Sequence, residues 1–480
     1  MPVRRLPQQP NLEHLRKQAK ALRRRVRAGE PGSVALVGEY HPNPPVVFGL
    51  SDAQLVTARM YGFGSWPKLV QHIETVHRYS RSPHEVQHGD GLAGEFLRLA
   101  CLTYGDDYRE RIRGADKLLT SAATVDVFTM AATGSADALR SLLAGDPLLA
   151  RTQGGPFGWE PLLYLCYSRV DTPGRYLDAA RLLLESGADP NAGFLWEGLP
   201  SPFTALTGAL GGGEGDQPPH RDGMALARLL LEAGADPNDS QALYNLGLGG
   251  SWSDDTAHLE LLLAFGLGQG DGGPWRARLG HTIASPRQLI RDELATAALR
   301  GGPRRTALLL EHGAEVDGIG EHPLFGGRTP YELALLNGHT EVANLLAAKD
   351  GSADLTESDA FIAACLRADT SVLSADPQLI AKVRTETPGL IDRATEHGNL
   401  AAVRLLAELG FDVNHRRGTT PLHTAVWNND EPMVRTLIAL GADPTIEDAD
   451  HNSTPLGWAE YLENDPMATY LREVTPSTTD

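Results

Sequence analysis

Four histidines lie close together in the sequence, and imidazole is a common metal ligand. They are His72, His77, His84 and His88. Only His84 and His88 have the i, i+4 spacing that would place two ligands on one face of a helix. Pro83 and Gly89 would interrupt that helix, and no cysteine lies nearby. We therefore expect residues 79–90 to form a solvated linker without a metal site.

Signatures of nucleotide chemistry or of a serine nucleophile are missing. The sequence has no GxxxxGK[ST] loop, no GxGxxG turn after a strand and no GxSxG elbow. The glycine-rich run at 211–215 lacks the lysine and the preceding strand of a phosphate-binding loop. We expect a protein that is not an enzyme, with no catalytic residues and no cofactor.

Composition and charge further limit the classes of protein to which this chain can belong. The chain has 480 residues, 41% of them hydrophobic, and a net charge of −18. This length predicts several domains or one extended solenoid, and the negative charge argues against general nucleic-acid binding. No apolar run approaches the roughly 20 residues that span a bilayer, and the start lacks a signal peptide. Three widely spaced cysteines, Cys101, Cys166 and Cys365, are expected to be reduced and buried. We expect a cytoplasmic protein.

The charge is uneven, because the first 30 residues are basic. They contain nine Arg or Lys and two Asp or Glu. Asn11 can cap a helix over 11–28, in which Leu12, Leu15 and Ala19 begin an apolar stripe. This helix could contact nucleic acid, anionic lipid or an acidic partner, or it could pack its stripe inward and leave its arginines in water. With the helices expected after Ser51 and Ser65, residues 1–78 are predicted to form a small helical module.

One phrase recurs through most of the remaining chain. It is clearest at 418–445, where Thr420-Pro421-Leu422-His423-x-Ala425 opens one helix and Gly441-Ala442-Asp443-Pro444 ends a second. Related fragments stand at 160–191, 201–238 and 328–346. The T-P-L-H-x-A run resembles the ankyrin repeat. The N-terminal segment also resembles that of some bacterial ankyrin-repeat proteins.

The resemblance implies an all-α ankyrin-repeat solenoid of roughly nine to ten helix pairs. The array would cover 124–475, with a helical cap at 91–123 and a disordered tail at 476–480. Threonine and proline suit the first turn of a helix, and glycine suits the left-handed turn that ends one. His423 is then expected to bond to backbone atoms.

Two insertions interrupt the repeat, at 192–223 and at 268–285. Long loops in compact domains are often functional, and aromatic and arginine side chains dominate interface energetics. Phe194, Trp196, Trp275 and Arg276 are therefore candidate partner-binding residues, unless the aromatics fold back over the repeats. Arg416 and Arg417, at the tip of a turn, are further candidates.

The best interpretation is a non-catalytic scaffold that binds a protein partner. One alternative is a nucleic-acid-associated regulator that uses the basic helix at 11–28. Another is a small-molecule or enzymatic cleft between the N-terminal module and the array, which would need converging polar groups.

Overall fold

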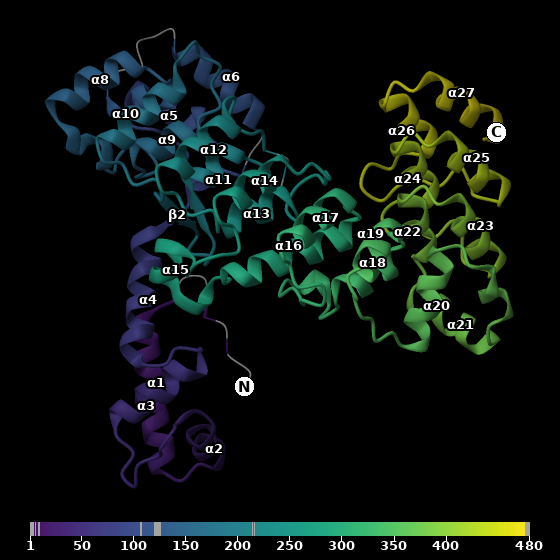
Figure 1. Cartoon of the computed structure of the whole chain (residues 1–480), viewed down its shortest axis with the longest axis horizontal. Coiled ribbons are helices and arrows are strands. Elements are labelled where there is room, and N and C mark those ends of the chain that lie inside the picture. Colours follow the sequence, from purple (N-terminus) through teal and green to yellow (C-terminus); the bar gives the residue numbers. More distant parts are fainter. Residues whose placement is uncertain are drawn as a thin grey trace. The chain divides into compact units, whose positions relative to one another are not determined.

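A computed structural model describes residues 4, 6–7, 10–105, 108–119, 126–213, 215 and 217–475. The chain forms two compact units, Met1–Ile290 and Arg291–Asp480, each described here by itself (Figure 1). The predicted disordered tail at 476–480 and the end of the predicted cap, 120–123, lie outside the described residues.

Four helices form the N-terminal module of the first unit. They are α1 (Leu12–Arg27), α2 (Pro31–Tyr40), α3 (Leu50–Met60) and α4 (Trp66–Tyr79). Asn11 caps α1 by accepting a hydrogen bond from the His14 amide, as predicted. The apolar stripe of α1 packs inward, with Leu15 and Ala19 buried. Helix α2 was not predicted, because Gly29 and Pro31 indicated only a stop.

Helix pairs fill most of the rest of the first unit. They are α5 (Gly91–Ala100), α6 (Tyr108–Leu119), α7 (Val127–Ala132), α8 (Ala136–Gly145), α9 (Pro161–Tyr167), α10 (Tyr176–Glu185), α11 (Ala205–Leu210), α12 (Gly223–Glu232), α13 (Ser240–Leu246) and α14 (Ala257–Ala264). A 3-10 turn, η2 (Pro147–Arg151), follows α8. The first helices contact one another in the order α5, α7, α9, α11, α13, and the second helices in the order α8, α10, α12. This two-row stacking is the solenoid that the repeat predicts.

A small sheet joins the predicted linker to the first insertion. Strands β1 (Ser80–Arg81) and β2 (Gly193–Trp196) are parallel, and β3 (Pro202–Thr204) pairs antiparallel to β2. A 3-10 turn, η1 (Pro83–Glu85), follows β1. The segment expected to be a solvated linker is therefore partly ordered by pairing with the insertion.

The second insertion is also structured. It forms α15 (Gly273–Leu279) and the 3-10 turn η3 (Gly280–Thr282). The next helix, α16 (Pro286–Arg300), contains the boundary between the two units.

The second unit continues with helix pairs. They are α17 (Pro303–Glu311), α18 (Pro330–Asn337), α19 (Thr340–Ala347), α20 (Glu357–Leu366), α21 (Pro377–Glu386), α22 (Leu390–Glu396), α23 (Leu400–Glu408), α24 (Pro421–Trp427), α25 (Glu431–Ala439), α26 (Pro455–Tyr461) and α27 (Asp465–Val474). Two 3-10 turns, η4 (Pro323–Phe325) and η5 (Thr370–Ser374), lie between them. Helices α22, α24 and α26 contact in succession, and α23 contacts α25 (Figure 1).

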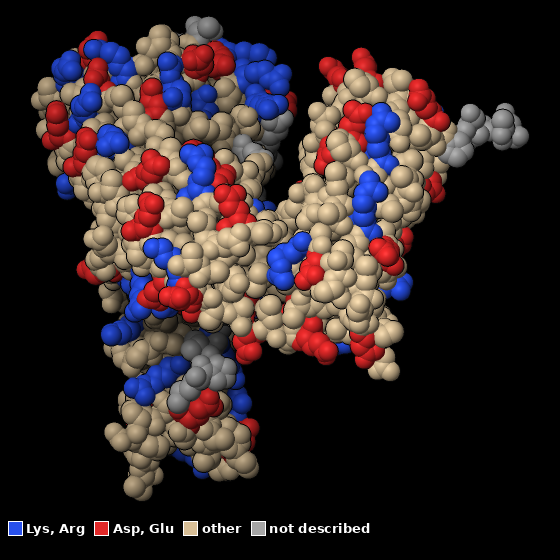
Figure 2. Space-filling view, turned by 45° about the vertical axis from the view of Figure 1, so that its right-hand side comes forward, with Lys and Arg blue, Asp and Glu red and all other residues tan. Residues whose placement is uncertain are grey.

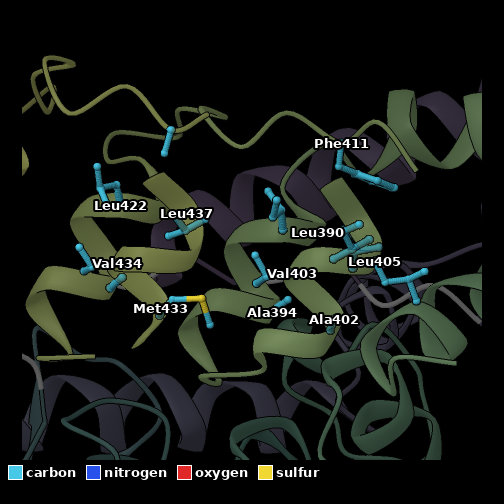
Figure 3. Close-up of a cluster of buried hydrophobic side chains, with 14 of the residues drawn as sticks. Leu390, Ala394, Ala402, Val403, Leu405, Phe411, Leu422, Met433, Val434 and Leu437 are labelled. Atoms are coloured by element: carbon cyan, nitrogen blue, oxygen red, sulfur yellow. The ribbon is translucent and has the colours of Figure 1, made fainter. Parts of the chain in front are cut away.

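The core of the second unit lies between successive pairs, as Figure 3 shows. Leu390 and Ala394 of α22 face Val403 of α23, and Leu422 of α24 lies beside Leu437 of α25. All five are almost fully buried. No single pair encloses its own apolar face, so the stability of each repeat depends on its neighbours.

Asparagine side chains link the turns of adjacent repeats. The Asn414 amide accepts from the Asp443 backbone amide at 2.7 Å and donates to the Gly441 carbonyl at 3.3 Å. Asn191 makes the same pair of bonds to Asp236 and Gly234. Gly441 has a φ of 96°, which confirms the predicted left-handed turn and explains the choice of glycine.

The predicted fold class is confirmed, because helices dominate and the strands form only one small sheet. The three cysteines are free and buried, as expected. Among the described helices, none is long and apolar enough to span a bilayer.

Candidate functional site

The second unit contains a cavity of about 750 Å³ with a largely aromatic lining. Its lining residues are Thr419, Thr424, Trp427, His451, Ser453, Trp458 and Tyr461. We call this cavity the aromatic groove. Its volume falls within the range of ligand-binding pockets, about 300 to 1,000 Å³.

Two first helices of neighbouring repeats supply the aromatic side chains. Trp427 is the last residue of α24, and Trp458 and Tyr461 lie one turn apart on α26. Helices α24 and α26 pack against each other, so the Trp427 and Trp458 rings meet edge to face at 5.6 Å. Trp427 is 58% exposed and Tyr461 is 81% exposed. Contiguous exposed apolar patches on the surface of a protein often mark interaction sites.

His423 supports the groove from behind. Its Nδ1 accepts from the Thr420 amide at 3.3 Å and lies 2.8 Å from the Thr420 hydroxyl, and its Nε2 lies 3.0 Å from the Ser453 carbonyl. These partners require an Nε2–H tautomer of a neutral ring. Burial lowers the pKa of His423, although the hydrogen bond to Ser453 opposes that shift. The histidine therefore has the structural role predicted for it and is not a free base.

Asp448 orients Trp458. The indole Nε1 donates to Oδ2 of Asp448 at 2.9 Å, and three backbone amides donate to the same carboxylate. Burial by itself would raise the pKa of Asp448, but these hydrogen bonds hold the pKa well below its usual value. The carboxylate is therefore ionised, and it fixes a ring that lines the groove together with the two exposed aromatics.

The groove lies in a strongly acidic part of the chain. Residues 418–475 contain ten Asp or Glu and two Arg, with no Lys. Both arginines are in ion pairs, Arg435 with Glu431 and Arg472 with Glu460, each at 2.6 Å. Figure 2 shows acidic side chains predominating around the end of the chain where α26 and α27 lie. The groove thus combines an aromatic surface with a negative surround.

The structure does not place the predicted insertion residues together on a surface. Phe194 is 2% exposed and stacks on Trp159 and Phe203, and Trp275 is 5% exposed. Their partner contact is untested, but their burial contradicts the surface position that the prediction assumed. Pairing of β2 with β3 buries Phe194, and packing of α15 on α4 of the N-terminal module buries Trp275.

The other predicted partner-binding residues differ in their exposure. Trp196 is half-buried and stacks on the His84 ring at 4.5 Å. Arg276 is also half-buried, and its guanidinium donates to the Ile283 carbonyl at 2.7 Å. Arg416 and Arg417 are exposed, so their partner contact stays a prediction.

The segment that contains His84 and His88 differs from the solvated linker that was expected at residues 79–90. His84-Glu85-Val86-Gln87-His88 has the H-E-x-x-H order of zinc peptidases, and the expectations of no metal site and no enzyme overlooked this motif. That motif requires a helix, whereas here η1 ends at Glu85. Among the described residues, the donor atoms that gather within 4.8 Å of one another come from His84, Glu85 and Glu197, without His88.

The space between the N-terminal module and the repeats is small. The cavity lined by Tyr79, Trp159 and Trp275 has a volume of about 40 Å³. That volume holds one or two waters and is far below the size of a substrate pocket. It gives no support to a substrate-binding cleft at this place.

The sequence analysis did not identify Trp427, Trp458 and Tyr461 as candidate binding residues. The available signal was three large aromatics in two successive first helices of the clearest repeats. Their exposure depends on where the helix ends fall, which the repeat pattern fixes only after stacking.

Comparison with known proteins agrees with this architecture. A family model described as ankyrin repeats in three copies matches residues 371–448 and 393–479, the region that includes the aromatic groove. The chain is also 37% identical over 92 residues to the palmitoyltransferase Hip14 of Drosophila melanogaster. That match covers 18% of this chain and 14% of Hip14, so this chain matches only a small part of that protein. The repeat match and the stacked helix pairs show that this chain contains ankyrin repeats within residues 371–479.

Proposed function

We propose that this protein is a non-catalytic scaffold and that its aromatic groove binds a basic segment of a partner protein. The observation that carries the proposal is the exposure of Trp427 and Tyr461 in one cavity with a fixed Trp458. Aromatic anchors in partly enclosed pockets contribute most of the energy of many interfaces.

Charge selects the class of partner. The groove is surrounded by an acidic stretch whose two arginines are already paired, so cationic side chains are attracted to it. A lysine or arginine can also lie over an indole or phenol face, which adds about 0.5 to 2 kcal/mol. The partner segment should therefore combine Lys or Arg with apolar residues.

The absence of catalysis is part of the proposal. The groove is lined by hydroxyl, indole, phenol and imidazole groups, and the buried His423 behind it is bonded through both ring nitrogens. The name of Hip14 specifies an acyl transfer, but 14% coverage of that protein does not bring its activity to this chain. We further propose a cytoplasmic location, supported by three free, buried thiols. The bacterial source stays a prediction.

Selection from a random peptide display library on the full-length chain tests this function. Enriched peptides should carry Lys or Arg beside apolar residues, and their capture should be lost on a Trp427→Ala/Tyr461→Ala double variant. Leu148→Ala/Leu324→Ala is a matched control, because it removes two exposed apolar side chains outside the groove. Enrichment of acidic peptides, or equal capture by the groove variant, would overturn the proposal.

The nucleic-acid alternative rests on α1. Its apolar stripe is committed to the core, while Arg24 and Arg25 remain exposed. We expect weak binding at most, because the chain as a whole carries −18. A filter-binding assay at low salt decides the question. Tight, strongly salt-dependent binding that is lost in Arg23→Ala/Arg24→Ala/Arg25→Ala would favour the alternative.

A further inference from the structure

A second cavity, of about 530 Å³, lies in the first unit, and neither the repeat match nor the proposed function accounts for it. Its walls come from α6, from the residues after α9 and from the residues before α12. We call it the arginine pocket. None of its lining residues lines the aromatic groove.

The charge of this pocket opposes that of the protein. Four arginines line it, namely Arg109, Arg113, Arg169 and Arg221, against one acidic residue, Asp171. Arg109 and Arg113 are one turn apart on α6 and therefore lie on the same face of that helix. Figure 2 shows a dense group of basic side chains in the part of the first unit where α6 lies. In a chain of net charge −18, such a grouping indicates a local attraction for anions.

Arg169 contributes a charge that no described carboxylate cancels by contact. Its guanidinium donates to the carbonyls of Pro218, Cys166, Ser168 and Gly208, at 2.6 to 3.0 Å. These bonds fix the group rigidly, but carbonyl oxygens do not neutralise it. Burial lowers the pKa of Arg169 to about 10, so the group stays charged at neutral pH.

His220 lies close enough to Arg169 and Arg221 to be affected by their positive charges. His220 is 3% exposed, and its ring lies 4.6 Å from that of Tyr176. Burial, together with the smaller effect of the charges of Arg169 and Arg221, lowers the pKa of His220 to about 3. Arg221 forms an ion pair with Asp171 at 3.1 Å, so the charge of Arg221 is partly balanced.

The remaining walls are apolar. Ile112, Val170, Pro218 and Pro219 line the pocket, together with the ring of Tyr108. Inorganic anions need no such surface, whereas an organic anion gains by burying its hydrocarbon or ring part there.

We infer that the arginine pocket binds a small organic anion, with its phosphate or carboxylate group at the arginines and its apolar body against Ile112, Val170 and the prolines. Arg109 and Arg113 make the charge-assisted hydrogen bonds, because they lie on one face of α6 and border the cavity. Arg169 adds a fixed positive field from its bonded position.

Isothermal titration of the full-length chain tests this site with three probes: naphthyl phosphate, inorganic phosphate and naphthol. Naphthyl phosphate should bind at least about 10-fold more tightly than either of the other two, which each carry one half of its chemistry. Its affinity should fall as salt is raised to about 0.3 M, because exposed charges are then screened.

Arg109→Gln/Arg113→Gln should weaken binding of naphthyl phosphate by at least about 10-fold, since two charge-assisted contacts are lost. Arg140→Gln/Arg228→Gln is the matched control, because it removes two exposed arginines of α8 and α12 outside the pocket. It should leave the affinity within about 2-fold. Circular dichroism verifies that both variants are folded. Binding no tighter than that of the two fragments, or equal affinity of the α6 variant and wild type, would overturn the inference.

Discussion

The indole of Trp458 donates a hydrogen bond of 2.9 Å to Asp448, a carboxylate that is 1% exposed. The amides of Asp450, His451 and Ser453 converge on the same two oxygens. One buried charge thus fixes both the loop before α26 and the central ring of the aromatic groove. The hydrogen bonds that order the loop of this repeat therefore also position the aromatic groove.

Asp448→Asn should lower the thermal stability of the protein at neutral pH, because an amide NH₂ would face backbone donors where an acceptor is needed. The pKa of Asp448 is lowered in the fold, so its contribution is present above the unfolded pKa of about 4 and is lost as the pH falls below it. The difference in melting temperature between wild type and variant should therefore shrink in acid. Differential scanning calorimetry over a pH series measures this.

Asp450→Asn is the control for that experiment. Asp450 is exposed and adjacent, so its replacement should change the melting temperature little at any pH. Equal effects of the two variants at neutral pH would contradict the role given to Asp448.

Trp275→Ala should destabilise the protein much more than Trp427→Ala. Trp275 packs with Val76, Leu195 and Leu279, and its Nε1 donates to the Asn191 carbonyl at 3.0 Å. Its removal should cost about 3 to 5 kcal/mol and expose the segment around α4 to protease. Trp427→Ala should cost less than about 1 kcal/mol, since that ring is mostly exposed.

Urea unfolding and limited proteolysis of the two variants separate these roles. Trp275→Ala should be cleaved faster than wild type near α4, and Trp427→Ala should not. A Trp275→Ala variant as stable and as resistant as wild type would restore the original hypothesis that the second insertion is a contact surface.

The sequence predicted those features whose cause is local. Thr420 and Pro421 start α24 because of their own chemistry, and Gly441 turns left-handed because it has no Cβ. The sheet could not be predicted in the same way. Ser80 pairs with Leu195, far away in sequence, and a two-residue strand has no alternation to detect.

The candidate site likewise combines features with a local cause and features that depend on long-range packing. Trp275 was predicted to contact a partner because the second insertion contains aromatic and arginine residues. It is instead buried by contact with Tyr79 of α4, and the two rings lie 5.0 Å apart. Trp427 and Tyr461 belong to the repeat pattern and each ends its helix, yet both are exposed, whereas Tyr167 at the end of α9 is buried. Helix ends and long-range contacts are decided by packing, which periodicity does not encode.

His72 makes the first unit sensitive to acid. It is 7% exposed and its ring lies 4.9 Å from that of Phe63. Burial, with a smaller effect of His281, lowers the pKa of His72 to about 4. Because the unfolded pKa is near 6.5, the unfolded chain binds the proton first, and stability is lost as the pH falls from about 6.5 to about 4.

His72→Leu removes this titration and should make unfolding of the first unit less dependent on pH. The stability of the variant relative to wild type should rise by up to about 3 kcal/mol over that interval. Urea midpoints followed by circular dichroism across the interval supply the measurement, with His88→Leu, which lies outside the core, as the control. A constant difference between His72→Leu and wild type would show that His72 does not titrate differently on folding.

The affinity of a selected basic peptide for the full-length chain, measured by isothermal titration, tests the central proposal most directly. Trp427→Ala/Tyr461→Ala should weaken binding by at least about 10-fold, since two aromatic anchors are lost, while the Leu148→Ala/Leu324→Ala control should not. Replacing the lysines and arginines of the peptide with glutamate should abolish binding to the acidic surround. Equal affinity of the groove variant and wild type, or tight binding of the glutamate peptide, would contradict the assignment of the aromatic groove as the partner-binding site.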